Sequence, residues 1–223
     1  MALEKTLAFL NQLKDNNNRP WFQEHKANYS EAKNQFDGFV NRLIPLVKGI
    51  DAGLDLSDAK ACTFRIYRDV RFAKDKSPYK INFGAFIARG GRKSPFAGYY
   101  LHCEPGGSFV GGGAHMPASR FLRAIRTRIY ENTDEFKAII EASEFKKYFK
   151  EIYGEKLKTT PRGFPKDFAE IDLLRHKHYS LAHTIADDFW TAEDAVDRIL
   201  DIFSAQYPFN TFINTAVEKA LME

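Results

Sequence analysis

Apolar residues recur at every third or fourth position near the start of the chain, which is the repeat of an amphipathic helix. Leu3, Leu7 and Leu10 form the apolar side of a helix predicted over residues 4–14. Three asparagines at positions 16–18 then favour a turn, so this helix is expected to end there.

The same repeat continues in a longer segment that begins at Pro20 and reaches about Val47. Proline suits the first turn of a helix because it has no N–H to satisfy there. We therefore expect a second helix over this segment, weakened at Gly38 and kinked at Pro45.

Apolar and polar residues alternate after residue 60, which is the pattern of half-buried strands. The segments that show it are residues 61–68, 82–88, 97–104 and 108–111. Short connections such as Pro105-Gly106-Gly107 predict an antiparallel meander, which the three glycines at 111–113 are expected to end.

The second half of the chain returns to helical spacing, with helices opening near Pro117 and Asn132. A short helix over 171–175, a strand over 178–184, and two final helices separated near Pro208 complete the expected elements. The order of elements predicts one α+β domain over residues 1–223. Its central antiparallel sheet has about four to six strands, flanked by N-terminal and C-terminal helices.

Composition narrows the class of protein. The apolar share of 44% and the charged share of 28% are those of a globular domain rather than a disordered chain. No apolar run is long enough to span a bilayer. The two cysteines lie in apolar, strand-like runs without disulfide or zinc spacing. Together with an N-terminus that does not resemble a secretion signal, these features predict a soluble, cytoplasmic protein.

Charge is distributed unevenly along the chain. The net charge is +4, but ten basic and two acidic residues lie between Lys60 and Lys93, so this segment carries +8 and the remainder about −4. A concentrated positive field of this kind attracts anions.

The basic segment supplies most of the candidate ligand-binding residues. Guanidinium groups bind phosphate and carboxylate bidentately, and lysine adds a point charge. The candidates are Arg65, Tyr67, Arg68, Arg71 and Lys80. The alternative is a solvated basic loop whose long side chains lie over aromatic rings. Asp69 and Asp75 are either acid–base groups or salt-bridge partners of these cations, and we favour the second role.

A second candidate is the glycine stretch Gly111, Gly112 and Gly113. Successive glycines let backbone N–H groups approach an anion, and a helix that begins near Pro117 would add its positive end. Equally, the glycines permit a tight hairpin and a closely packed strand. The spacing matches neither a Walker loop nor a dinucleotide-binding fingerprint.

Histidines offer weaker candidates. His176 and His178 have the spacing of two metal ligands on a strand, but no convincing third ligand accompanies them, so we expect no metal and no cofactor. His102 and His115 flank the glycine stretch as acid–base candidates, although each is more often a hydrogen-bonded structural residue.

Four motifs together resemble a known family of bacterial and fungal proteins. They are RIYRDVRFAKDKSPYK (residues 65–80), PGGSFVGGG (105–113), PRGF (161–164) and IDLLR (171–175). The family is known as a conserved domain of unknown function, and the resemblance covers nearly the whole chain. It implies no activity, cofactor or catalytic residue. Its distinctive blocks are the basic stretch, the glycine stretch and the PRGF segment, which contains Arg162. We expect these blocks to converge on one pocket.

These observations predict a basic pocket for a phosphate- or carboxylate-bearing small molecule. Whether the protein is an enzyme stays open; metal-independent transfer or hydrolysis of a charged group would be the class. One alternative is a single-stranded nucleic-acid-binding module, since aromatic residues are interleaved with the cations, although the modest net charge counts against it. Another is a scaffold that pairs with an acidic partner. No membrane partner is expected.

Overall fold

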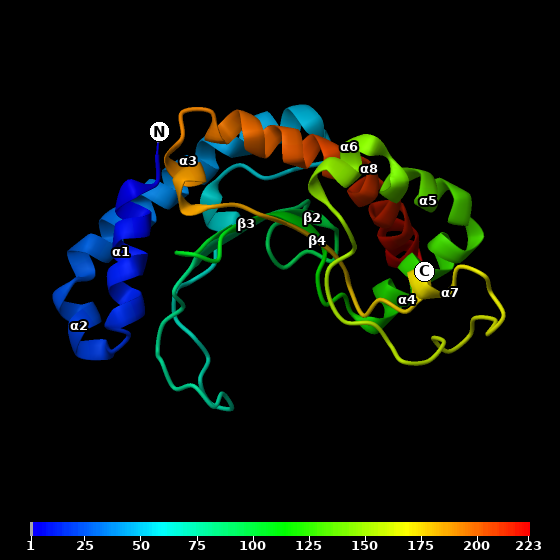
Figure 1. Ribbon diagram of the computed structural model, residues 1–223, viewed down its shortest axis with the longest axis horizontal. Helices are drawn as coiled ribbons and strands as arrows, with labels where there is room; N and C mark the ends of the chain where they lie inside the picture. The colour runs from blue at the N-terminus through cyan, green and yellow to red at the C-terminus, as the bar shows by residue number, and fades with distance from the viewer. Residues whose placement is uncertain (1) are drawn as a thin grey trace.

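The computed structural model describes residues 2–223 (Figure 1). Three helices precede a three-stranded meander. Four helices, a fourth strand and a long final helix follow it. In chain order the elements are α1 (Glu4–Asp15), α2 (Arg19–Glu24), α3 (Lys26–Ile50), η1 (Ala59–Ala61), β1 (Phe83–Ile87), β2 (Gly98–Cys103), β3 (Phe109–Ala114), α4 (Ser119–Glu131), α5 (Thr133–Glu141), α6 (Ser143–Tyr148), α7 (Ile171–Leu174), β4 (Tyr179–Thr184), η2 (Asp187–Thr191) and α8 (Ala195–Met222).

The four strands form one antiparallel sheet in the order β1-β2-β3-β4. Its register pairs Ala85 with Leu101 and Leu101 with Val110. Helices precede and follow this sheet in the chain, so the predicted α+β class is confirmed. No helix within residues 2–223 is long and apolar enough to cross a membrane.

One face of the sheet is covered by helices α3 and α8 (Figure 1). Alternate strand residues point into this layer: the Phe83 ring of β1 lies 5.6 Å from the Phe36 ring of α3, and the Tyr99 ring of β2 lies 4.8 Å from the Phe203 ring of α8. The buried apolar residues form one connected core.

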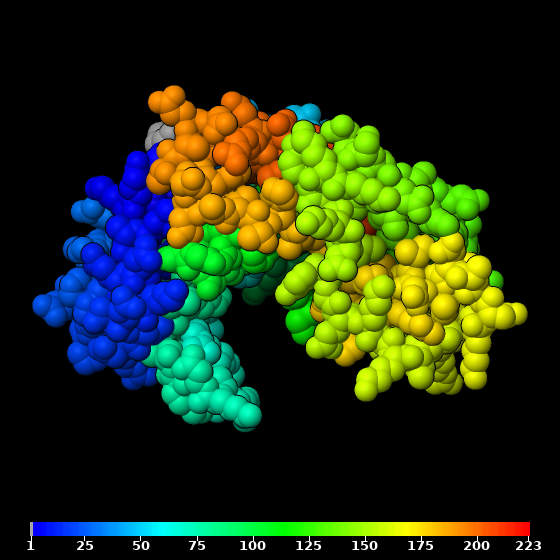
Figure 2. All heavy atoms as spheres, viewed as in Figure 1, coloured from blue at the N-terminus to red at the C-terminus, as the bar shows by residue number. Residues whose placement is uncertain are grey.

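The opposite face of the sheet is the roof of an arch (Figure 2). One leg is a hairpin-like loop, Arg65–Lys80, which we call the finger; α1 and α2 lie beside it. The other leg contains α4 and the loop of residues 153–166, which we call the arm. The hollow between the two legs exposes the sheet.

The finger is attached to the helices at its root. The Asn17 side chain donates to the Tyr79 carbonyl at 3.0 Å and accepts from the Tyr79 N–H at 3.1 Å. The Tyr79 ring is stacked on Phe22 with centroids 3.9 Å apart. These contacts fix the direction in which the finger leaves the body.

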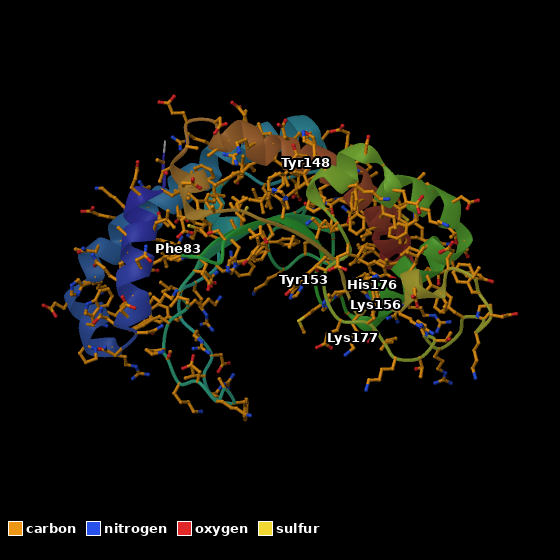
Figure 3. All side chains as sticks on the ribbon, in the orientation of Figure 1. Phe83, Tyr148, Tyr153, Lys156, His176 and Lys177 are labelled. Atoms are coloured by element: carbon orange, nitrogen blue, oxygen red, sulfur yellow. The ribbon has the colours of Figure 1, made fainter. Side chains whose placement is uncertain are left out.

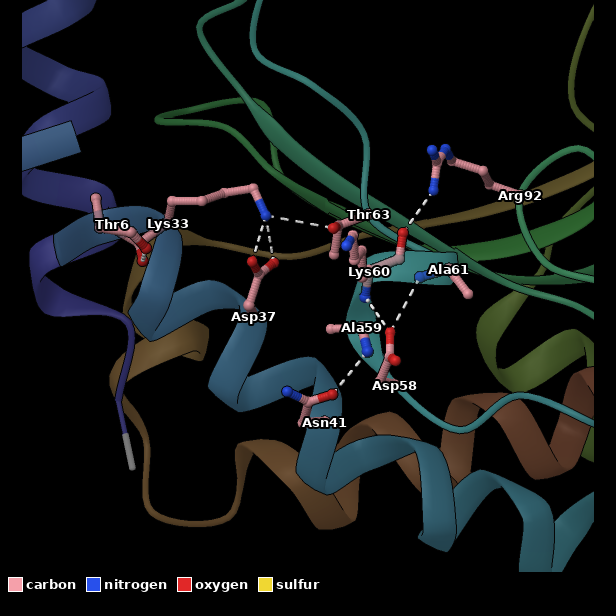
Figure 4. A network of polar contacts seen from close by, with 11 residues as sticks. Thr6, Lys33, Asp37, Asn41, Asp58, Ala59, Lys60, Ala61, Thr63 and Arg92 are labelled. Atoms are coloured by element: carbon pink, nitrogen blue, oxygen red, sulfur yellow. Dashed lines mark hydrogen bonds and ion pairs between the residues drawn. The ribbon is translucent and has the colours of Figure 1, made fainter. Parts of the chain in front are cut away.

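The strand predicted over residues 61–68 is absent. Asp58 caps η1 instead, its Oδ1 accepting from the N–H of Lys60 at 2.8 Å, and Asn41 Oδ1 of α3 accepts from the Ala59 N–H at 2.6 Å (Figure 4). Because these bonds bend the chain at its start, only isolated bridges remain, such as Thr63 with Ala85.

The glycine stretch does not end the sheet, contrary to the prediction. Strand β3 continues through Gly111, Gly112 and Gly113 to Ala114, paired with β2 on one side and β4 on the other. A side chain at Gly111 would overlap the Leu181 carbonyl oxygen of β4. The glycines therefore allow the strands to approach closely, which was the alternative interpretation.

The helix boundaries also differ from those predicted. The chain breaks between α2 and α3 at His25, and α3 then continues through Gly38 and Pro45 to Ile50. Helix α8 likewise continues through Pro208. Both long helices bury an apolar side against the core, and packing of this kind outweighs local propensity.

Candidate functional site

A cavity of about 900 Å³ lies in the roof of the arch, on the sheet face opposite α3 and α8. Its walls combine side chains from the sheet, the finger root, the loop before β2 and the start of α4. Those used below are Phe64, Lys80, Phe86, Arg92, Lys93, Tyr100, His102, Phe109, Arg120 and Tyr153.

Alternation along the strands produces the aromatic part of this wall. Because Tyr99 and Leu101 point into the core, Tyr100 and His102 of β2 point into the cavity. Phe109 is opposite His102 on β3, and the two rings are stacked with centroids 4.6 Å apart. The sheet therefore presents a continuous aromatic surface.

A chain of hydrogen bonds runs along the exposed face of β2. His102 Nε2 lies 2.8 Å from Glu104 Oε2, and His102 Nδ1 lies 3.1 Å from the Tyr100 hydroxyl. Since the carboxylate only accepts, the proton is on Nε2, and Nδ1 accepts from Tyr100. Burial, with the nearby Glu104 charge, raises the pKa of Tyr100 to about 12, so the phenol stays protonated at neutral pH. The Tyr100 hydroxyl thus donates its proton to the His102 imidazole, which the Glu104 carboxylate holds in place.

Lys80 is one of the cations of this wall. It is half-buried at the root of the finger, and its ammonium lies 5.5 Å from the centre of the Phe64 ring. Burial, and then the charge of Arg65, lower the pKa of Lys80. Among the residues described, no carboxylate forms an ion pair with it.

The charge of the cavity is of one sign. Lys80, Arg92, Lys93 and Arg120 line it, and none of the described lining residues is Asp or Glu. Arg92 is held at the rim because its Nη1 donates to the Lys60 carbonyl at 2.6 Å (Figure 4). An anion that enters meets cations and aromatic rings without an opposing carboxylate.

Of the residues predicted in the basic segment, only Lys80 lines this cavity. Arg68 pairs with Asp75, and Arg71 Nη2 donates to Asp69 at 2.7 Å. The prediction that both aspartates are salt-bridge partners is therefore confirmed. The cations do not point at one place, because these pairs hold two of the arginines along the finger. Arg65 and Tyr67 are exposed on the finger.

The other predicted residues are placed as follows. Gly112 and Gly113 line the cavity and Gly111 does not. Their N–H groups belong to a strand paired on both sides, so the expected row of donors for an anion is not formed. Arg162 is exposed on the arm, outside the cavity lining. Two of the three blocks therefore meet in this cavity, through Lys80 and through Gly112 and Gly113, whereas Arg162 of the third block lies outside its lining.

The histidine pair does not form a metal site. His176 is buried, which lowers its pKa to about 4, whereas the His178 ring lies 5.2 Å from the His115 ring. Within residues 2–223 no group of three or more His, Cys, Asp or Glu side chains is arranged to hold a metal ion.

Several residues at the cavity were missed from the sequence: Tyr100, Glu104, which bonds to His102 from outside the lining, and the rings of Phe86 and Phe109. A signal for the first two was present: Tyr100, His102 and Glu104 are separated by two residues each, the spacing that places side chains on one face of a strand. The phenylalanines are assembled from separate segments, so spacing does not reveal them.

Comparison with known proteins gives a family and no relative of known activity. No curated protein and no solved structure shows a significant match to the chain. A family model described as "Conserved hypothetical protein (DUF2461)" matches residues 5–212. Because this match covers nearly all of the chain and the four motifs lie within it, the protein belongs to the DUF2461 family of conserved hypothetical proteins.

Proposed function

We propose that the cavity binds a small organic anion, a molecule with a ring or other flat apolar body and a phosphate or carboxylate group. The observation that carries this proposal is Lys80, a half-buried cation that pairs with no carboxylate in the described part of the chain and lies in an aromatic cavity whose described lining contains no Asp or Glu. Ordinarily a buried charge is paired, so an unpaired one is suited to pairing with a bound ligand.

The remaining walls have complementary roles in this proposal. Tyr100 and Phe109 pack against the flat body of the ligand, because aromatic rings stack on other π systems. The Tyr100 hydroxyl donates its proton to His102 and is held in place by the His102–Glu104 pair, so its oxygen accepts from an N–H or O–H group of the ligand. A volume of about 900 Å³ is in the range of cavities that enclose small molecules.

We place this binding in the cytoplasm. Both cysteines, Cys62 and Cys103, are buried free thiols, and burial raises the pKa of Cys62 to about 12. Unpaired thiols are typical of a reducing compartment.

Thermal-shift measurements with matched ligand pairs test the proposal. AMP is compared with adenosine, and indole-3-acetate with indole-3-ethanol, because each pair differs in the anionic group. A ligand that binds the folded state raises the melting temperature, by several degrees at about 100 times its dissociation constant. We expect the anionic member of at least one pair to do so and its neutral counterpart to have a much smaller effect.

Lys80→Met keeps the length of the side chain and removes its charge, so it should abolish the preference for the anion. Lys74→Met removes an exposed charge of the finger outside the cavity lining and is the matched control. Equal shifts for charged and neutral ligands, or an undiminished preference in Lys80→Met, would contradict the proposal.

A further inference from the structure

The finger carries an apolar side chain that the fold does not use. Phe72 is 97% exposed at its tip, beside Arg71. A single exposed ring is common on protein surfaces and is not by itself a binding site, but a nearly fully exposed ring among cations can stack on a base while the cations hold phosphates. A partner that fits the tip would stack on the Phe72 ring and carry negative charge to pair with the nearby cations.

Polar contacts hold the tip in shape without Phe72. Lys76 Nζ donates to the Val70 carbonyl at 3.0 Å, and Asp75 Oδ1 accepts from the Ser77 N–H at 2.9 Å. Asp69 Oδ1 accepts from Arg71 Nε at 3.0 Å. Both acidic residues are thus engaged within the finger, while its six basic and two acidic residues give a net charge of +4. The finger presents Phe72 on a preformed, cationic loop.

The arm presents similar chemistry on the other side of the hollow. Tyr153 is 59% exposed and lines the cavity, and Figure 3 shows it on the side of the arm that borders the hollow. From Lys156 to Lys166 the chain contains four basic residues and no acidic one. Both legs of the arch therefore carry positive charge and an exposed ring.

Exposed rings extend from the finger into the roof of the arch. Tyr67 is 48% exposed on the finger with its ring 6.0 Å from that of Phe22, and at the root of the finger the ring of Phe64 lies 6.3 Å from that of Tyr100. A flat bilayer reaches the tip of the finger but not rings inside an arch. A flexible chain of alternating rings and phosphates reaches all of them, and stacking of bases on aromatic side chains combined with a cationic path is how single strands are bound.

We propose that the arch binds a single-stranded nucleic acid. One nucleotide occupies the cavity, with its base against Tyr100 and Phe109 and a phosphate at Lys80. The strand continues along the finger, where Phe72 stacks on a further base, and the arm contacts the other end. This inference rests on the proposed anion-binding cavity and identifies its ligand as part of a longer strand.

Fluorescence anisotropy with fluorescein-labelled dT12 and U12 tests this inference, with unlabelled dTMP and UMP as competitors. We expect the 12-mers to bind at least about a hundredfold more tightly than the mononucleotides, because they contact the finger as well as the cavity. Affinity should fall steeply with salt, with a log–log slope near −0.7 for each phosphate contact. Tight binding of either 12-mer supports the proposal, and their ratio gives the preferred sugar.

Substitution of Phe72 separates stacking from general electrostatic attraction. Phe72→Ala should weaken 12-mer binding about tenfold, the loss expected for one stacked base. It should leave the thermal shift produced by AMP unchanged. Leu46→Ala is the matched control, since Leu46 is 45% exposed on α3, away from the finger. In Phe72→Trp, binding should quench the emission of the new indole.

Two outcomes would overturn this inference while leaving the proposed function intact. The first is an AMP-dependent thermal shift in a protein that binds the 12-mers no more tightly than the mononucleotides. The second is Phe72-dependent sedimentation with phosphatidylserine vesicles without 12-mer binding, which would assign the tip to a membrane surface. If the protein instead shows no preference for the anionic ligand of either matched pair, the proposed anion-binding function itself is contradicted.

Discussion

At the scale of single residues, Lys80 and its neighbours determine what the cavity can bind. The basic segment predicted Lys80 as a candidate, and the sequence also identified Asp69 and Asp75 as salt-bridge partners. It did not predict that Lys80 would be separated from the other cations. That separation follows from pairing: the short spacing of Arg71 and Asp69 lets them bind each other, whereas no carboxylate of residues 2–223 forms an ion pair with Lys80.

The unpaired charge of Lys80 should reduce the stability of the folded protein. Its pKa is lowered from 10.5, mainly by burial, so the unfolded state binds a proton more tightly than the folded state. The resulting cost is complete below the folded pKa and disappears as the pH rises through 10.5. We predict that Lys80→Met raises the melting temperature at pH 7 by about 1–3 °C.

Calorimetry at pH 7 and pH 11 measures this effect. The melting temperature of Lys80→Met should exceed that of the wild type by less at pH 11 than at pH 7. The melting temperature of the exposed variant Lys74→Met should differ little from that of the wild type at either pH. A lower melting temperature for Lys80→Met at pH 7 would show that the ammonium stabilises the fold, and would weaken the argument that it is reserved for a ligand.

At the scale of elements, strand β3 shows what residue spacing leaves undetermined. The stretch from Gly111 to Gly113 has no apolar alternation, so a sequence reading ends the strand there. In the folded sheet, the absence of side chains at these glycines lets β2 and β4 approach β3 closely. Local spacing did not determine the helix boundaries either. Pro45 and Pro208 lie inside long helices because the apolar sides of α3 and α8 are buried.

Gly111→Ala should destabilise the protein by about 4 kcal/mol or more, because the new methyl group would overlap the backbone of β4 and force a central pair of strands apart. Gly106→Ala is the matched control. Gly106 lies at a turn with φ +74° and open space around it, so alanine there should cost only about 1–2 kcal/mol of backbone strain.

Urea denaturation of the two variants provides the comparison. If Gly111→Ala cannot be obtained folded, the yields of soluble protein of the two variants, expressed at reduced temperature, give the same ranking. Similar costs for positions 111 and 106 would contradict the close approach of β3 and β4.

At the scale of the whole molecule, the arch places two exposed legs on a continuous core. The finger is fixed to the body at its root, by Tyr79 among others, and the described hydrogen bonds of its tip, such as that from Lys76 to Val70, are made within the finger. The core under the roof joins α3, α8 and the sheet. Local opening should therefore be easy in the legs and rare in the roof.

Timed digestion with trypsin tests this difference. In the native protein we expect the first cuts in the finger or the arm, at sites such as Lys74 or Arg162. Sites in α3 and α8, such as Lys48 and Arg198, should be cut only after unfolding in urea. Mass spectrometry of the early fragments identifies the cuts, and an early cut within α3 or α8 would contradict a single stable roof.

The sequence alone determined the helices at both ends, the antiparallel strands and the basic segment, because these depend on periodicity and charge among residues close together in the chain. The tertiary structure decided which residues share the cavity. Phe64, Tyr100 and Lys80 come together only when the finger root folds over the sheet, and Gly111 is required only because Leu181 lies against it. Such contacts join residues far apart in the chain, and local patterns do not specify which distant segments will meet.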